Sequence, residues 1–141
     1  MVPAQAGAAE DVPVLSIVGG MVGFPGRSRF ILVRADDDPT TCWFVMRCVD
    51  DPDLSFVVTH PGPFFPEYAP DIDDAAAARL GLSAETVEDE AMLLVVVTVG
   101  EQIEGSTANL LAPLIVNRRT REGAQVVLAG SPWSLREQLV R

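Results

Sequence analysis

The amino-acid sequence predicts a mostly β, single-domain protein with an antiparallel, barrel-like fold and one short α-helix. A chain of 141 residues is long enough for one domain, and with 48% hydrophobic residues it can build a core. Eleven prolines and eleven glycines separate short apolar runs, as expected for many short strands joined by turns. The sequence lacks the regular alternation of strand and helix patterns that a doubly wound α/β fold requires.

The first half of the chain predicts four strands. A loose, Ala- and Gly-rich terminus over residues 1–11 precedes strands over 12–18 and 30–34. The clearest strand covers 42–49, because its side chains divide between two faces at a period of two. An Asp-Asp-Pro-Asp turn separates it from a strand over 54–59, so we expect these two strands to form a β-hairpin.

A short helix is expected over about residues 71–81. The eleven residues before it include four prolines, which exclude a helix or a central strand there. Asp71 is the expected N-cap, and Asp73 and Asp74 favour the positive end of the helix dipole. Gly81 fits the position just after the last helical turn.

The second half of the chain predicts a central strand and a second hairpin. Residues 91–99 are apolar on both faces and rich in β-branched side chains, as in a strand covered on both sides. Strands over 114–117 and 125–129 are expected to pair around a polar turn. Residues 12–130 therefore form the predicted domain, and the tail over 131–141 begins with a Ser-Pro pair that can start a short C-terminal helix.

The charge of the chain is unevenly distributed. The formal net charge is −10, but residues 35–90 hold fourteen acids against Arg47 and Arg79, a net charge of −12. Residues 115–141 hold five arginines against two glutamates, a net charge of +3. An acidic surface repels phosphate backbones and attracts basic partners, so we expect protein partners and no direct nucleic-acid binding.

The sequence indicates a cytoplasmic protein. The longest strongly apolar run, residues 91–99, is far shorter than the roughly 20 residues that cross a bilayer, and the N-terminus lacks the pattern of a signal peptide. Cys42 and Cys48 lie on one predicted strand, roughly 20 Å apart, so they cannot bond to each other. Two free thiols favour a reducing compartment.

The residues that catalysis or metal binding would need are few. His60 is the single histidine, no Gly-x-Ser-x-Gly motif is present, and two cysteines with one histidine are too few for a typical zinc site. The acids at 71–74 lack the glycine and the final carboxylate of a calcium loop. The glycines at 19–26 are followed by no Gly-Lys-Ser/Thr motif. We therefore expect neither an enzyme nor a cofactor.

Several motifs in this order and spacing resemble the FliW family of flagellar assembly factors, over about residues 14–130. They are Gly-Phe-Pro-Gly at 23–26 with Phe-Ile-Leu at 30–32, Cys-Val-Asp-Asp-Pro-Asp-Leu-Ser-Phe at 48–56 with Pro-Phe-Phe-Pro-Glu-Tyr at 63–68, and Thr-Ala-Asn-Leu-Leu-Ala-Pro-Leu-Ile-Val-Asn at 107–117 with Gly-Ala-Gln-Val-Val-Leu at 123–128.

The resemblance implies a barrel-like β fold without catalysis or cofactor. It also implies two cytoplasmic partners, flagellin and the RNA-binding translational regulator CsrA. In the family, free FliW sequesters CsrA and relieves repression of flagellin translation, while flagellin competes for FliW. The charge distribution suits such a role, because an acidic protein docked beside an RNA-binding repressor would repel incoming RNA.

The candidate partner-binding residues fall into three groups, each with a structural alternative. The aromatic residues of the Pro-rich loop are suitable anchors, but they could equally fold over an open barrel end. The acids around the loop could meet a basic partner, or they could be a solvated surface that keeps the protein soluble. Two polar residues match family positions, although an asparagine after a turn is often structural. The groups are Phe64, Phe65 and Tyr68; Asp50, Asp51, Asp53, Glu67, Asp71, Asp73 and Asp74; and Thr107 with Asn109.

A second hypothesis is a β-barrel that binds a small molecule in its lumen. Such a site needs polar groups that point into the barrel, and the two most apolar strands offer only Thr98 and Arg47. We expect the free protein to be a monomer.

Overall fold

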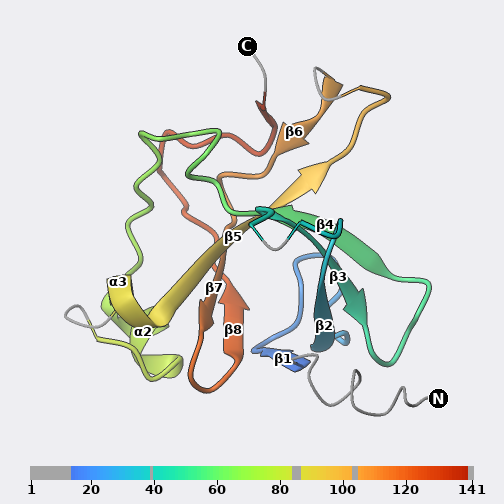
Figure 1. Cartoon of the computed structure of the whole chain (residues 1–141). Coiled ribbons are helices and arrows are strands. Elements are labelled where there is room, and N and C mark those ends of the chain that lie inside the picture. Colours follow the sequence, from blue (N-terminus) through green and yellow to red (C-terminus); the bar gives the residue numbers. More distant parts are fainter. Residues whose placement is uncertain (1–13, 39, 84–86, 103–104, 140–141) are drawn as a thin grey trace.

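The structure, a computed structural model, describes residues 14–38, 40–83, 87–102 and 105–139. Its strands form one sheet in the order β4-β3-β2-β1-β8-β7-β5-β6-β9, and an additional pairing of β4 with β5 closes part of this sheet into a barrel (Figure 1). The elements are β1 (Val14–Ile17), β2 (Arg29–Arg34), β3 (Trp43–Cys48), β4 (Ser55–Thr59), α2 (Asp74–Arg79), α3 (Val87–Glu90), β5 (Ala91–Thr98), β6 (Thr107–Ala108), β7 (Leu114–Asn117), β8 (Glu122–Gln125) and β9 (Glu137–Gln138).

The long strand β5 joins the barrel to a smaller extension. Its first half, from Ala91 to Leu94, pairs with β7, and Val95 to Val97 pair with β4. Its last residues pair with β6, which in turn pairs with β9. The predicted central strand is confirmed. Both of its faces are apolar because one, with Leu94, lies against the barrel core, and the other, with Leu93 and Val95, lies against the hydrophobic clusters outside the barrel.

The predicted barrel is confirmed, but the prediction that it is wholly antiparallel is wrong in one place. The closed ring runs β1-β2-β3-β4-β5-β7-β8 and returns to β1. A ring with an odd number of strands cannot alternate in direction at every step, so one neighbouring pair must be parallel. That pair is β1 with β8, in which Ser16 lies opposite Glu122 and Ile17 opposite Gly123.

The barrel interior is a packed core. Alternate residues of its strands point inward, as the period-two pattern predicts, and Phe30, Met46 and Val58 are completely buried. The buried cluster in the interior consists of Leu15, Ile17, Met21, Phe30, Met46, Cys48, Val58, Leu94, Leu114 and Val116. These side chains fill the space that the lumen-binding hypothesis needs for a ligand.

The β3–β4 hairpin is confirmed, with Arg47 opposite Ser55 at its closed end. The second hairpin forms between β7 and β8, but β8 begins at Glu122, earlier than the predicted 125–129. Gly123 of β8 lies very close to β7. A Cβ atom there would lie 2.9 Å from the Ile115 carbonyl oxygen, so only glycine allows this close pairing of the two strands.

Two predictions about helices are corrected. The N-cap of α2 is Asp73 and not Asp71, because the extended backbone of Asp73 lets its carboxylate accept a hydrogen bond from the Ala76 amide at 2.7 Å. Gly81 ends the helix as predicted, with φ at +72°. The predicted C-terminal helix is absent from the described residues of the tail. In its place the tail follows bends and a turn and then adds the two-residue strand β9 to the sheet.

Candidate partner-binding surface

The Pro-rich loop between β4 and α2 folds along the sheet through its own turns. The Pro61 carbonyl accepts hydrogen bonds from the amides of Phe64 and Phe65 at 3.0 and 2.8 Å, and the Phe65 carbonyl accepts one from Tyr68 at 2.9 Å. Proline fixes φ near −65°, so these turns hold the aromatic side chains in a preset arrangement.

The aromatic residues of this loop build a second hydrophobic cluster beside the barrel core. Phe65 is buried, whereas Phe64 and Tyr68 are half-buried. Phe64 packs edge-on against Trp43, with 5.2 Å between ring centroids, and Tyr68 packs edge-on against Trp133 at 4.7 Å. Phe65 is therefore a core residue, which is the structural alternative to partner binding. Phe64 and Tyr68 are partly exposed, and their exposed edges can contact a partner.

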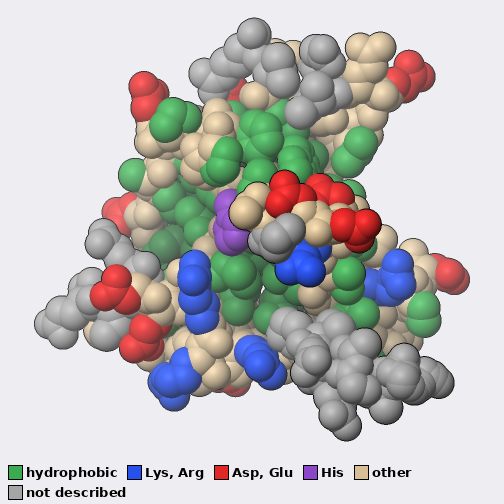
Figure 2. Space-filling model, viewed as in Figure 1, with side chains coloured by type: hydrophobic (Ala, Val, Ile, Leu, Met, Phe, Trp, Pro, Cys, Tyr) green, Lys and Arg blue, Asp and Glu red, His purple; other side chains and the backbone are tan. Residues whose placement is uncertain are grey.

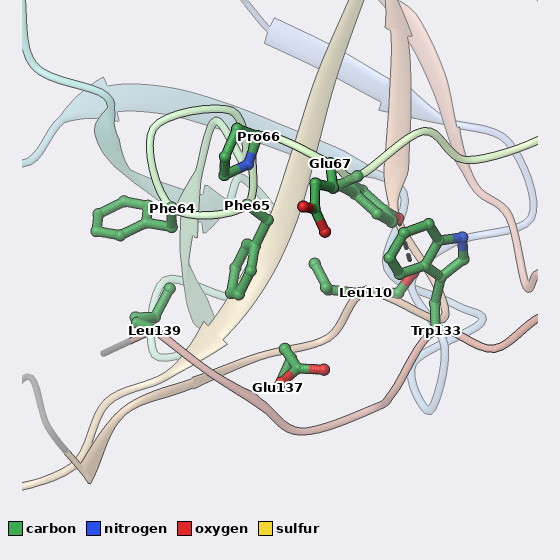
Figure 3. Close-up of a pocket in the computed structure, with 9 residues that line it drawn as sticks. Phe64, Phe65, Pro66, Glu67, Leu110, Trp133, Glu137 and Leu139 are labelled. Carbon is green, nitrogen blue, oxygen red and sulfur yellow. Dashed lines mark hydrogen bonds between the residues drawn. The ribbon is translucent and has the colours of Figure 1, made fainter. Parts of the chain in front are cut away.

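A groove of about 370 Å³ opens between this loop and the C-terminal tail. In Figure 3, Glu67 lies on one side of it and Glu137 on the other, with Leu110 between them and Trp133 at one end. Because the groove combines aromatic walls with two carboxylates, we call it the aromatic groove. It is lined by Phe64, Phe65, Pro66, Glu67, Tyr68, Leu110, Trp133, Glu137 and Leu139.

A second hollow, of about 640 Å³, lies on the other side of Tyr68, between the loop and α2. Its wall contains Asp71 and Asp74, and its floor contains apolar residues of β5 and β7 such as Leu93 and Ile115. Asp73 takes no part in the lining because it caps the helix. The second hollow therefore places two exposed carboxylates beside apolar surface.

The predicted acids of the β3–β4 loop lie elsewhere. Figure 1 shows this loop at the lower right, across the molecule from α2. Asp50 lies 2.6 Å from the Arg29 guanidinium, and Asp51 lies 3.5 Å from that of Arg27. The hydrogen bond from Arg29 lowers the pKa of Asp50. The predicted acids therefore lie in two separate groups. In the group on the β3–β4 loop, arginines partly neutralise Asp50 and Asp51, while Asp53 is exposed.

Arginines form a separate exposed group. Figure 2 shows basic side chains at the lower left, around α2 and the β7–β8 hairpin. Arg79 of α2 and Arg118, Arg119 and Arg121 of the hairpin are all exposed. Three of these arginines come from the basic stretch of the sequence, but Arg79 lies on α2 together with Asp74, so acidic and basic side chains adjoin at this end of the fold.

The two polar candidates have clear structural roles. Asn109 accepts hydrogen bonds at its Oδ1 from the amides of Leu111 and Ala112, at 3.1 and 3.0 Å, and so stabilises the turn after β6. Thr107 belongs to β6, where it lies between Thr98 and Gln138 in the sheet. For Asn109 the geometry favours the structural alternative.

Sequence reasoning missed the contribution of the tail to the aromatic groove. Trp133, Glu137 and Leu139 come from the segment after residue 130, which we treated as a separate tail. One signal was available, because Trp133 is one of only two tryptophans and such a side chain is usually packed.

The part of the chain that the structure describes offers neither a metal-binding cluster nor a membrane-spanning helix. It contains no group of three or more His, Cys, Asp and Glu side chains that could hold a metal ion. His60 is half-buried, with its Nδ1 3.3 Å from the Leu93 carbonyl oxygen and its ring against Phe44. None of the described helices has the length and apolar character needed to cross a membrane.

Replacing Tyr68 with phenylalanine is expected to lower the free energy of unfolding by about 1 kcal/mol at neutral pH, because its hydroxyl donates to the Leu110 carbonyl at 2.6 Å. Burial also raises the pKa of the Tyr68 phenol above its ordinary value of 10.0. The unfolded chain therefore loses this proton first, and stability that is fully present below pH 10 should fall as the pH rises further.

Urea unfolding between pH 9 and 11.5 checks this pH dependence. The chain has no lysine and a single tyrosine, so Tyr68 is the principal group with an ordinary pKa in this range. Above pH 10 the wild type should lose up to about 1.4 kcal/mol per pH unit more than the phenylalanine variant, because any contribution of the two free cysteines is common to both proteins. An equal slope in both proteins would contradict the prediction.

Comparisons with known proteins agree in sequence and in structure. A family model described as FliW protein matches residues 5–139. A flagellar assembly factor FliW from Symbiobacterium thermophilum is 36% identical over 128 residues, covering 89% of this chain and 88% of the relative. The corresponding protein of Treponema pallidum is 34% identical over 127 residues, covering 90% of this chain and 81% of the relative.

The same likeness holds in three dimensions. A solved structure described as the crystal structure of the flagellar assembly factor FliW superimposes with a TM-score of 0.80 and 29% sequence identity. The match covers 91% of this chain and 86% of that one. The likeness therefore extends over the barrel and most of the remaining chain.

Proposed function

This chain belongs to the FliW family of flagellar assembly factors, and from that premise we propose that it binds the translational regulator CsrA and flagellin in the cytoplasm. In this proposal the free protein sequesters CsrA and relieves repression of flagellin translation. Newly made flagellin competes for it and returns CsrA to its RNA target.

The observation that carries the proposal is the placement of exposed carboxylates beside apolar surface in two hollows that share Tyr68. Asp71 and Asp74 border the second hollow, and Glu67 borders the aromatic groove. A protein that binds RNA must present a basic surface. Carboxylates attract that surface, the apolar walls supply contact area, and the same negative charge repels RNA phosphates from the complex.

Calorimetric titration with the CsrA and flagellin of the same genome tests the proposal. We expect each partner to bind, CsrA to bind more tightly at low salt, and flagellin to displace CsrA from a preformed complex. Circular dichroism verifies that the protein is folded in each titration. Absence of heat with both partners at low salt, from folded protein, would refute the proposal.

The double variant Asp71→Asn with Asp74→Asn is expected to bind CsrA about three- to tenfold more weakly, with a shallower dependence on salt. Each removed charge at an exposed position contributes about 0.2–1 kcal/mol to the attraction. Asp73 is left intact because it caps α2. The matched control is Glu122→Gln, which removes one exposed charge from β8, beside Arg121. Titration at two salt concentrations gives both quantities, and equal effects of the variant and the control would contradict this assignment.

A further inference from the structure

We propose that the outer face of β1, β2 and β3 binds an apolar segment of a protein partner and pairs a carboxylate of that segment with Arg47. We call this surface the valine face, and it consists of Val14, Ile31, Val33, Val45 and Arg47. The proposal goes beyond the proposed function and does not depend on it, because these residues line neither the aromatic groove nor the second hollow.

The pairing register of the strands places these side chains together outside the barrel. Side chains of β2 and β3 alternate between the two faces of the sheet, and Phe30 and Met46 point into the core. Their neighbours along each strand therefore point outward. In one outward-facing row, Val14 of β1 lies opposite Ile31 of β2, which lies opposite Arg47 of β3.

A second row, of four valines, shows where the cover of the barrel ends. Val33, Val45, Val57 and Val97 lie opposite one another in turn on β2, β3, β4 and β5. Val97 is 5% exposed because it packs in the cluster that contains Phe65, whereas Val33 at the other end of the row is 42% exposed. The Pro-rich loop and the tail, which supply that cluster, thus cover only one end of the row.

The other covered part of the barrel lies on the side of α2. Figure 1 shows α2 beside β7 and β8, away from β2 and β3. There Ala77 and Leu80 pack with Ile115 and Ala124. Within the described residues, the aliphatic side chains of the valine face belong to none of the three hydrophobic clusters. The solvated face of an antiparallel sheet is usually polar, so an apolar one indicates a surface that another molecule covers.

The charge of the valine face selects the kind of partner. Arg47 is exposed and, unlike Arg27 and Arg29, forms no ion pair with any residue that the structure describes. A guanidinium beside aliphatic side chains is complementary to an apolar segment with one carboxylate, which it can hold through two parallel N–H bonds. A second copy of this chain fits less well, because two chains with a net charge of −10 each repel one another, and anionic lipid is disfavoured for the same reason.

The test uses two blocked pentapeptides, alanine–leucine–glutamate–leucine–alanine and the same peptide with glutamine in place of glutamate. Because the protein has a net charge of −10, its overall field favours the glutamine peptide, and a local contact with a cation is needed to reverse that order. The readout is the methyl signals of Val33 and Val45 in a carbon–proton correlation spectrum, which the variants Val33→Thr and Val45→Thr assign.

We expect both peptides to shift these methyl signals and the glutamate peptide to bind about two- to fivefold more tightly. Arg47→Gln should abolish or reverse this preference, because only the overall repulsion of the glutamate then remains. The matched control is Arg118→Gln, which removes one exposed arginine from the β7–β8 hairpin and should keep the preference.

The apolar part of the site is tested with the same peptides. Val33→Thr should weaken the binding of both peptides about twofold and leave their ratio unchanged, because it removes one methyl group from the contact. Its matched control is Val127→Thr, at a position that is 54% exposed and lies after β8, and it should alter neither affinity.

Tighter binding of the glutamine peptide, equal binding of the two peptides, or a preference that survives in Arg47→Gln would each overturn the inference. Absence of shifts at Val33 and Val45 would do the same. Sedimentation examines the other occupants of the face. A wild-type dimer that Val33→Thr dissociates, or cosedimentation with phosphatidylserine vesicles that Val33→Thr abolishes, would assign the face to self-association or to lipid and would also overturn the inference.

Discussion

Replacing Asn117 with alanine is expected to lower the free energy of unfolding by about 2–4 kcal/mol. Asn117 is completely buried at the end of β7. Its side-chain amide donates to the Leu80 carbonyl at 2.7 Å, and its Oδ1 accepts from the amides of Arg119 and Thr120 at 2.9 and 3.3 Å. Alanine would leave these backbone groups without their partner and would open a cavity.

The measurement is urea unfolding followed by circular dichroism, with Asn109→Ala as the matched control. Asn109 also accepts two backbone hydrogen bonds, but it is only half-buried, so water can replace them. We expect the control to cost about 1 kcal/mol. A loss at Asn117 no larger than the loss at Asn109 would show that burial does not set the cost.

Asn117 also supports the second hollow. Its bond to Leu80 holds the end of α2 against the β7–β8 hairpin, and α2 carries Asp74 in the wall of that hollow. The alanine variant should therefore also weaken CsrA binding in the proposed function, even though Asn117 is buried and contacts no partner.

The parts of the fold that follow from local patterns could be predicted from the sequence. The β3–β4 hairpin needs only alternating side chains and a turn of four residues, so its register is set within one short segment. β5 was recognisable because a strand whose two faces are both covered is apolar on both faces. Gly81 marked the end of α2 through its left-handed backbone.

The parts that depend on distant segments could not be predicted. The pairing of β1 with β8 is parallel because the ring closes with an odd number of strands. No local sequence pattern reveals how many strands the ring will have. The tail was assigned a helix from its Ser-Pro start, but β6 offered an open sheet edge. Pairing with that edge outweighs a weak helical preference.

For the candidate surface too, local features could be predicted from the sequence, whereas contacts between distant segments could not. The acids between residues 35 and 90 suggested one continuous patch, yet Arg29 and Arg27 come from an earlier part of the chain and neutralise Asp50 and Asp51. The aromatic loop was found from its composition alone. Its partner Trp133 was not, because the contact between Trp133 and Tyr68 joins segments that are distant in the sequence.

Replacing Leu139 with alanine is expected to lower the free energy of unfolding by about 2–4 kcal/mol. Leu139 is 6% exposed and belongs to the cluster that contains Phe65 and Val97. Its amide donates to the Ser106 carbonyl at 3.2 Å, which anchors the tail to the residue just before β6. We propose on this ground that residues 131–139 are an integral part of the domain.

Leu135→Ala is the matched control, because it removes the same atoms from the same tail at a position that is 57% exposed. It should change stability by less than about 0.5 kcal/mol. If both variants are nearly neutral in urea unfolding, the tail is dispensable for the fold. If only Leu139→Ala is costly, the tail is held by its buried end.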